Sequence, residues 1–226
     1  MKISSEQPKI IIVGSSSIDL VLNASHHPAP NENVMATKSE TFFGGKGANQ
    51  AVGTARLGAS VYFIGSVGMD PYGQQILRNL VDENVNVGFV HEDTEHATGT
   101  AYVTAAYGKN AIVVVPSANS SLPTQNVDMA EKFFSTADLV LTQLEIPMNV
   151  VENVYQKCKK YGKKLGIYAS PAAKIAPEIL EYATFIIAKS NELSIIFDEE
   201  PREQTLRKYP NKLFVRDDTN STIYYN

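Results

Sequence analysis

The sequence has little cysteine, little net charge and no long apolar run. Its single cysteine, Cys158, excludes an internal disulfide, which is typical of a protein in a reducing compartment. The 24 acidic and 20 basic residues leave a formal charge of -4, so we expect neither nucleic acid nor a membrane surface as a partner. No apolar run reaches membrane-spanning length, and the first eight residues lack the apolar core of a secretion signal. We therefore expect a soluble cytoplasmic protein.

Two familiar glycine motifs are also missing. A Walker A loop needs a glycine, four further residues and then Gly-Lys-Ser/Thr, but Glu40 stands at the first glycine position and Gly47 at the hydroxyl position. The dinucleotide fingerprint needs G-x-G-x-x-G after the first strand, but Gly14 is followed by three serines and Ile18. Both absences argue against a P-loop nucleotidase and against a dinucleotide-dependent dehydrogenase.

The residues that are present have a globular composition, with 43% hydrophobic and 19% charged residues. Short runs rich in β-branched residues predict strands that are buried on both faces, as in a parallel sheet. These runs are residues 10–14, 61–64, 139–141, 164–168, 185–187 and 213–215. Helical apolar stripes lie between them, one at Ala48, Ala51, Val52 and Ala55 and another at Val151, Val154, Tyr155 and Cys158. This alternation predicts an α/β fold with a doubly wound, mostly parallel sheet between two layers of helices.

One stretch departs from the alternation of strands and helices. Residues 100–107 and 111–115 are rich in β-forming residues, and the turn-forming segment 108–110 lies between them, which predicts a hairpin. Together with the β-branched segment 20–22, this hairpin predicts a small second sheet that stands off the main one as a lid. We expect a single α/β domain over residues 1–226, with lid strands within about residues 20–42 and 97–116.

The segment 42–50 contains three glycines, Gly44, Gly45 and Gly47, directly before a predicted helix that begins near Ala48 and ends near Gly58. A helix N-terminus presents free N–H groups, so such a corner suits an oxygen-rich ligand. The alternative is a plain tight connection between sheet and helix. A charged donor and an amide, Lys46 and Asn49, favour a binding site because a plain turn has little use for them.

Polar residues follow three of the predicted strands, where open α/β sheets place their ligands. Asp19 lies just beyond the first strand, and its carboxylate can accept hydrogen bonds from two adjacent hydroxyls. Glu145 follows residues 139–144, and Asn191 and Glu192 follow the strand at 185–187. A single acid at such a place is usually an exposed loop residue, but three strand ends together predict a site.

Five segments, in this order along the chain, resemble the ribokinase-like (PfkB) carbohydrate kinases, and the ribokinase branch of that family most closely. They are residues 13–19, 44–51, 97–101, 143–147 and 190–192. The resemblance implies transfer of a phosphoryl group from MgATP to a sugar hydroxymethyl group. It also implies that the lid closes over the sugar, which excludes water, and that two copies can pair through the lid as a homodimer.

The resemblance also implies roles for individual residues. The substrate-binding residues would be Asp19, Gly44, Gly45, Lys46 and Asn49, with Glu145 near the sugar. Asn191 would lie near the nucleotide phosphates, with Mg²⁺ and ATP as cofactors. The family further uses a monovalent cation, which is held by a loop that we do not find in these 226 residues.

Several positions depart from the family pattern. A second signature of the form Gly-Ala-Gly-Asp, which supplies an anion hole and the catalytic base, is not found, so we assign no catalytic residue and no metal ligand. A turn that contacts the nucleotide in the family carries Arg216, Asp218 and Ser221 in place of a threonine and two glycines. Ser194 replaces a glutamate of the magnesium network, and Ser17 replaces an asparagine that contacts the sugar. We therefore expect an impaired kinase, or alternatively an inactive sugar-binding or regulatory relative.

The remaining reactive side chains have structural interpretations. The pair His26-His27 and the separate His91 and His96 do not have the spacing of a metal site, so we expect surface positions for them. Cys158 lies on an apolar helical stripe and is expected to be a buried, inert thiol. The lysines at positions 157, 159, 160, 163 and 164 are expected to form a solvated helix end.

Overall fold

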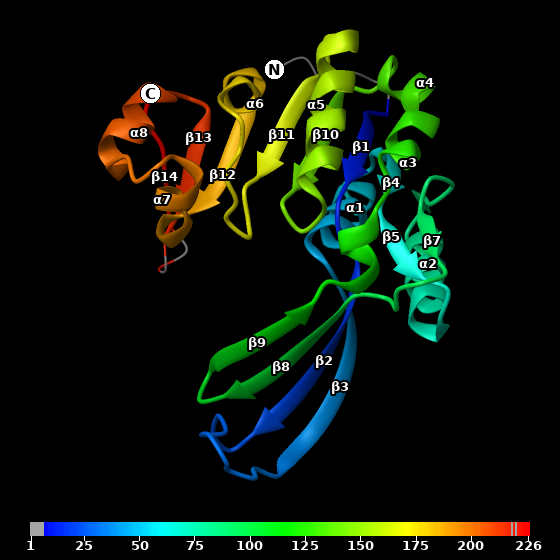
Figure 1. Ribbon diagram of the computed structural model, residues 1–226, viewed down its shortest axis with the longest axis vertical. Helices are drawn as coiled ribbons and strands as arrows, with labels where there is room; N and C mark the ends of the chain where they lie inside the picture. Colours follow the sequence, from blue (N-terminus) through cyan, green and yellow to red (C-terminus); the bar gives the residue numbers. More distant parts are fainter. Residues whose placement is uncertain (1–6, 218, 220) are drawn as a thin grey trace.

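The main body of the protein is a mostly parallel sheet with helices on both faces, as the sequence predicts (Figure 1). The computed structural model describes residues 7–217, 219 and 221–226. Within these residues the sheet has eight strands. In spatial order they are β14 (Thr222–Ile223), β13 (Leu213–Arg216), β12 (Phe185–Lys189), β11 (Lys164–Tyr168), β10 (Leu139–Gln143), β1 (Lys9–Val13), β4 (Ser60–Ile64) and β6 (Val85–Asn86). Neighbouring strands run parallel except β14, which pairs antiparallel with β13.

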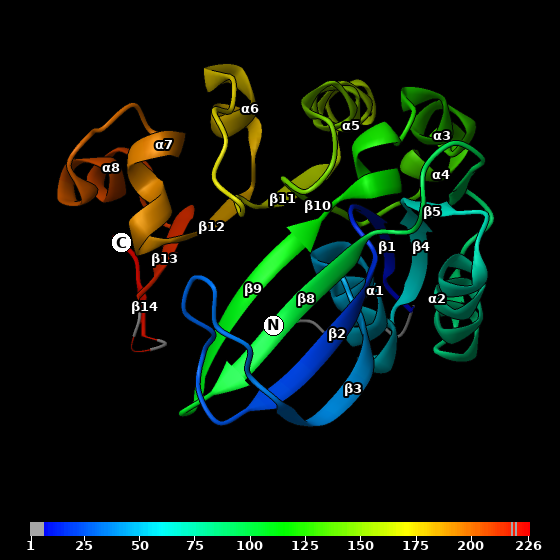
Figure 2. The same cartoon turned by 60° about the horizontal axis from the view of Figure 1, so that its bottom comes forward.

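The two faces of this sheet carry unequal numbers of helices (Figure 2). One face packs against α1 (Lys46–Arg56) and α2 (Pro71–Asp82). The other packs against α3 (Thr124–Met129), α4 (Glu131–Phe134), α5 (Met148–Tyr161), α6 (Pro177–Tyr182), α7 (Leu193–Ile196) and α8 (Arg202–Lys208). On the first face a groove of about 340 Å³ remains beside α1, above β11 and β12. No helix in the described part of the chain is long and apolar enough to cross a membrane.

The predicted helical stripes are the buried faces of α1 and α5. Val151, Val154, Tyr155 and Cys158 are all buried against the sheet, and burial raises the pKa of the Cys158 thiol to about 12. At the basic end of α5, Lys159, Lys160 and Lys164 are exposed as expected, but Lys157 is not. The Lys157 ammonium is only 14% exposed and contacts acids of α3 and α4, at 2.8 Å from Asp128 and 3.0 Å from Glu131. The lysine therefore joins three helices.

The lid is a four-stranded sheet that projects from the body (Figure 1). Its order is β3 (Ala36–Gly44), β2 (Ser17–Ala24), β8 (Thr100–Ala106) and β9 (Lys109–Val115), with β2 and β8 parallel. The hairpin between β8 and β9 turns at Tyr107 and Gly108, which have φ of 52° and 70°, so the expected turn at 108–110 lies one residue too late. Two residues with positive φ are typical of the tight turns that match strand twist.

The connection from the body to β8 is held by a buried aspartate. Asp93 ends β7 (His91–Asp93), which pairs with β5 (Ser66–Gly68). Burial alone raises the pKa of Asp93, but hydrogen bonds from the Ser121 hydroxyl and from the N–H groups of Glu95 and His96 outweigh it. The pKa of this carboxyl is therefore well below its ordinary value. Since Ser121 ends the short helix η1 (Ser117–Ser121), Asp93 joins the segments before β8 and after β9.

Candidate functional site

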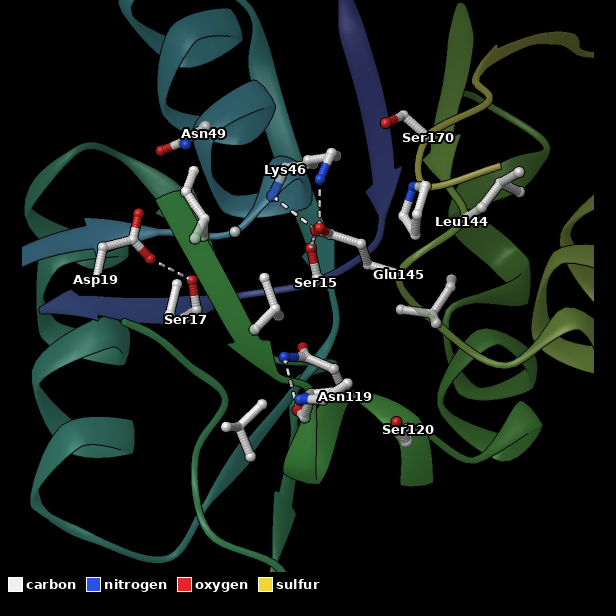
Figure 3. Close-up of a pocket in the computed structure, with 18 of the residues that line it drawn as sticks. Ser15, Ser17, Asp19, Lys46, Asn49, Asn119, Ser120, Leu144, Glu145 and Ser170 are labelled. Carbon is white, nitrogen blue, oxygen red and sulfur yellow. Dashed lines mark hydrogen bonds and ion pairs between the residues drawn. The ribbon is translucent and has the colours of Figure 1, made fainter. Parts of the chain in front are cut away.

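A cavity of about 660 Å³ lies between the lid and the ends of the main strands (Figure 3). This volume is typical of a pocket for a small-molecule ligand. The body contributes the start of α1, the segment after β10 and the ends of β11 and β12. The lid contributes the start of β2 and the inward side chains of β8 and β9, among them Ala101, Ile112 and Val114. The cavity is thus polar toward the body and apolar toward the lid strand β9.

Five of the predicted sugar-binding residues line this cavity: Asp19, Gly45, Lys46, Asn49 and Glu145. The sixth, Gly44, lies directly beneath Asp19. A Cβ atom added at Gly44 would be 2.1 Å from Asp19 Oδ1, so only a glycine leaves room for the carboxylate.

The predicted nucleotide residue, Asn191, is placed differently from the sugar-binding residues. It is exposed on the short helix η2 (Ser190–Glu192), and the described residues that line the cavity include its neighbours Lys189 and Glu192 instead.

The glycine loop brings α1 against the end of β1. Gly45 is the N-cap of α1 with φ of 88°, and the helix begins at Lys46, two residues earlier than expected. A Cβ at Gly47 would be 2.7 Å from the Gly14 carbonyl carbon, and the Ala48 N–H donates to the Ser15 carbonyl at 2.9 Å. These close approaches require glycine at positions 45 and 47, and they fix Lys46 and Asn49 beside the cavity.

A carboxylate of the protein itself, that of Glu145, lies at the N-terminus of α1. Glu145 Oε1 forms an ion pair with the Lys46 ammonium. Glu145 Oε2 accepts hydrogen bonds from Ser15 Oγ at 2.5 Å and from the Lys46 N–H at 3.3 Å (Figure 3). A carboxylate is stabilised at a helix N-terminus by the dipole and the free N–H groups. Two N–H groups at this helix start therefore have partners within the protein, Glu145 for Lys46 and the Ser15 carbonyl for Ala48, and the Lys46 ammonium is paired with Glu145.

Asp19 supplies the second carboxylate of the cavity. Its Oδ1 accepts a hydrogen bond from Ser17 Oγ at 2.8 Å, two residues earlier on β2. Asp19 and Asn49 lie on one side of the cavity, and Ser15 and Glu145 lie toward the other (Figure 3). An acid with one oxygen oriented by a serine, facing an amide and an ammonium, can accept from and donate to several hydroxyl groups at once.

Sequence reasoning missed several residues of the site. Ser15, Asn119 and Lys189 line the cavity without having been singled out, whereas Glu192, which also lines it, was named at the end of its predicted strand. Ser17 lines it too, but was noted in the sequence only as a departure from a family pattern. A serine run after the first strand was a weak signal, because serine is common in connections. Asn119 carried no signal, since its hydrogen bonds reach Ser16, 103 residues earlier.

Residues 7–226 match the family described as pfkB family carbohydrate kinase. The chain belongs to the pfkB family of carbohydrate kinases. This pfkB member is 37% identical over 215 residues to the ribokinase of Bacillus subtilis, covering 95% of this chain and 73% of that protein. It is 34% identical over 222 residues to the ribokinase of Lactococcus lactis, covering 96% of this chain and 72% of that protein.

Solved structures give the same assignment for the fold of the pfkB member. The structure of Arabidopsis thaliana ribokinase complexed with ribose and ATP superposes with a TM-score of 0.81 at 27% identity. This superposition covers 98% of the present chain and 78% of the other. The ribokinase of Thermotoga maritima superposes with a TM-score of 0.79 at 26% identity. The main sheet with its smaller sheet is therefore the ribokinase fold.

Side chains that could ligate a metal ion do not cluster in the described part of the pfkB member. Over residues 7–217, 219 and 221–226, no group of three His, Cys, Asp or Glu side chains could hold an ion. Mg²⁺ bound with a nucleotide needs only one or two carboxylates, because phosphate oxygens and waters supply the remaining ligands. Glu192, which lines the cavity at the end of β12, fits that requirement.

The turn after β13 is formed differently from a glycine turn. Asp217 Oδ1 accepts hydrogen bonds from the N–H groups of Thr219 and Ser221, each at 2.9 Å, and from Thr219 Oγ1 at 2.7 Å. The side-chain hydrogen bond from Thr219 and these backbone bonds lower the pKa of Asp217. Asp218, one of the positions that depart from the family pattern, lies outside the described residues.

Proposed function

We propose that this pfkB member binds an unphosphorylated, ribose-like sugar between Asp19 and Lys46 and transfers to its hydroxymethyl group a phosphoryl group from MgATP. The observation that carries the proposal is the pairing of Lys46 with Glu145. Because the ammonium and the helix N-terminus already hold a carboxylate, the positive charge of Lys46 is compensated at the sugar end of the described cavity, while Asp19 adds a negative charge there. A neutral polyol suits such a surface, whereas the phosphate of a sugar phosphate would meet two carboxylates.

The proposed nucleotide end of the cavity is the rim at β11 and β12. Ser170, Lys189 and Glu192 line it, away from Asp19. Lys189 supplies a positive charge for phosphate oxygens, and Glu192 supplies an oxygen for a magnesium ion or its water. ATP, when bound, supplies the phosphoryl group, and Mg²⁺ shields its charge.

We further propose that the turnover of this 226-residue chain is low. The acids that line the described cavity are Asp19, Glu145 and Glu192. Glu145 already accepts three hydrogen bonds, from Ser15 and Lys46, which makes it a weaker acceptor for the hydroxyl proton. The same observation supports a second candidate function, a sugar-binding relative without phosphoryl transfer.

A homodimer through the lid is part of the proposal. Tyr102 and Val113 lie opposite each other on β8 and β9 and are 48% and 66% exposed. They are on the other side of the lid from Ile112 and Val114, which line the cavity. Light scattering should give a dimer that Val113→Asp converts to a monomer. A wild-type chain that is monomeric at high micromolar concentration would contradict this part of the proposal.

Calorimetry of D-ribose against D-ribose 5-phosphate tests the proposed sugar site. We expect heat of binding from ribose and none from the phosphate ester, and we expect Lys46→Met to abolish ribose binding. Gln74→Ala, on the remote surface of α2, is the control variant. ADP release with MgATP and ribose then separates the two candidate functions. Slow, ribose-dependent release supports an impaired kinase, release at the background rate supports the binding relative, and binding of neither sugar rejects both.

A further inference from the structure

The lid joins the body at a crossing formed around one buried side chain, Asn119, which is 4% exposed. We propose that Asn119 is a positioning residue that links the orientation of the lid to the geometry of Asp19 and of the cavity-lining serines Ser15 and Ser17. Its effect on the lid can be tested without any ligand. Its effect on binding rests on the proposed sugar site.

Asn119 contacts the ends of two lid strands through hydrogen bonds. Its Oδ1 accepts from the Ser16 N–H at 2.9 Å, and its Nδ2 donates to the Ser16 carbonyl at 2.8 Å. Nδ2 also donates to the Pro116 carbonyl at 3.1 Å. Ser16 immediately precedes β2, and Pro116 immediately follows β9. Because only an oxygen can accept from the Ser16 N–H, this bond also fixes the orientation of the amide.

A third lid strand meets Asn119 through a glycine. Gly99 precedes β8, and a Cβ atom added there would be 2.3 Å from Asn119 Nδ2. The Gly99 carbonyl accepts from the Ile18 N–H at 3.0 Å, which joins this position to β2 as well. Asn119 therefore touches the starts of β2 and β8 and the end of β9. A rotation of the lid that separates these three points must break its hydrogen bonds.

The backbone that Asn119 holds is the one that orients the sugar-binding side chains. Ser15 and Ser17 flank Ser16, and both line the cavity. Ser15 Oγ donates to Glu145, which belongs to the body, while Ser17 Oγ donates to Asp19, which belongs to the lid. Fixing both backbone groups of Ser16 sets the positions of these two hydroxyls relative to each other. Without Asn119, Asp19 moves with the lid independently of Lys46.

The variants that test this role are Asn119→Leu and Gly99→Ala. The leucine has similar volume and removes all three side-chain hydrogen bonds, while the alanine displaces the Asn119 amide without altering it. Asn126→Leu is the matched control for the first, because Asn126 is 9% exposed and donates to a backbone carbonyl, Phe89, away from the lid. Gly53→Ala is the control for the second, since no atom lies within 4 Å of its added Cβ.

Amide hydrogen exchange of the unliganded chain gives the first readout. In Asn119→Leu we expect exchange to rise at least about tenfold at residues 16–18 and 99–115, with β11 and β12 unchanged. Asn126→Leu should leave the lid pattern intact. A uniform rise over the whole molecule in Asn119→Leu, as from a general loss of stability, would overturn the inference.

Calorimetry with D-ribose gives the second readout. We expect about tenfold weaker binding in Asn119→Leu and in Gly99→Ala. The combined variant Gly99→Ala/Asn119→Leu should lose less than the sum of the two single losses, because both substitutions act on one contact. Wild-type affinity in both single variants would refute the linkage to the site. If wild-type protein binds no ribose, the proposed function fails, and the exchange result alone decides whether Asn119 sets the lid.

Discussion

The ion pair between Lys46 and Glu145 determines the charge of the cavity, and a double-mutant cycle measures its strength. The variants are Lys46→Met, Glu145→Gln and their combination. Each retains roughly the shape of the original side chain, so the cycle isolates the pairing from the packing. Lys46→Met removes one of the three hydrogen bonds to the Glu145 carboxylate, the one from the Lys46 ammonium. The bonds from Ser15 Oγ and from the backbone N–H of residue 46 stay in place.

The expected coupling energy follows from the burial of the pair. The side chains of Lys46 and Glu145 are 30% and 17% exposed, so the pair is neither a surface contact nor a fully buried one. Hydrogen bonds between charged groups contribute about 1.5–3 kcal/mol, and breaking a fully buried pair costs about 3–5 kcal/mol. Partial exposure places the coupling at the lower range, about 1.5–3 kcal/mol.

Urea unfolding at pH 7, monitored by two spectroscopic probes, gives the four free energies of unfolding. Arg207 and Glu203 form the control pair, because their side chains are 57% and 80% exposed on α8 and should show no measurable coupling at high salt. A coupling between Lys46 and Glu145 below about 0.5 kcal/mol, the usual limit of additivity, would refute the view that Glu145 neutralises the glycine loop.

Three further predictions test single positions. Gly44→Ala should abolish ribose binding, because the added Cβ would meet Asp19. Gly53→Ala in α1 should bind ribose normally and raise the free energy of unfolding by about 0.5–1 kcal/mol. Equal ribose binding by the two variants would contradict this role of Gly44. The Cys158 thiol should not react with a thiol reagent at pH 8 until urea unfolds the chain, because burial raises its pKa to about 12. Reaction in the native state would instead show that the thiol is accessible. Asp93→Asn should lower the free energy of unfolding by about 1–3 kcal/mol at pH 7. The native pKa of Asp93 is depressed, so the stabilisation that it gives is lost when the carboxylate is protonated. The difference from wild type should therefore shrink as the pH falls below the ordinary aspartate pKa of 3.8. If the difference in unfolding free energy were constant with pH, the loss of stability would come from packing and not from the charge of Asp93.

The main sheet could be predicted because its signals are local. Strand β1 and the buried stripe of α5 can be recognised from short segments of the sequence. The glycine loop can be recognised from its three glycines, because close approach of the backbone to its neighbours requires them. The partner of Lys46 was not predictable in this way, because Glu145 lies 99 positions later. Both residues were expected near a sugar, but their pairing with each other changes the charge that a ligand meets. The pattern indicates which side chains gather, and only the structure shows which of them neutralise one another.

The path of the chain from β1 to β2 explains why the site needs both the body and the lid. Residues 14–16 leave the main sheet and continue as the second strand of the lid, so the cavity is lined where one sheet passes into the other. Ser15 is bound to the body through Glu145, and Asp19 moves with the lid. A sugar that hydrogen-bonds both Asp19 and Lys46 therefore connects the two parts, as Asn119 does within the protein. Under the proposed function, binding energy at the hydroxyls would hold the lid closed and exclude water, which would favour transfer to the sugar over hydrolysis.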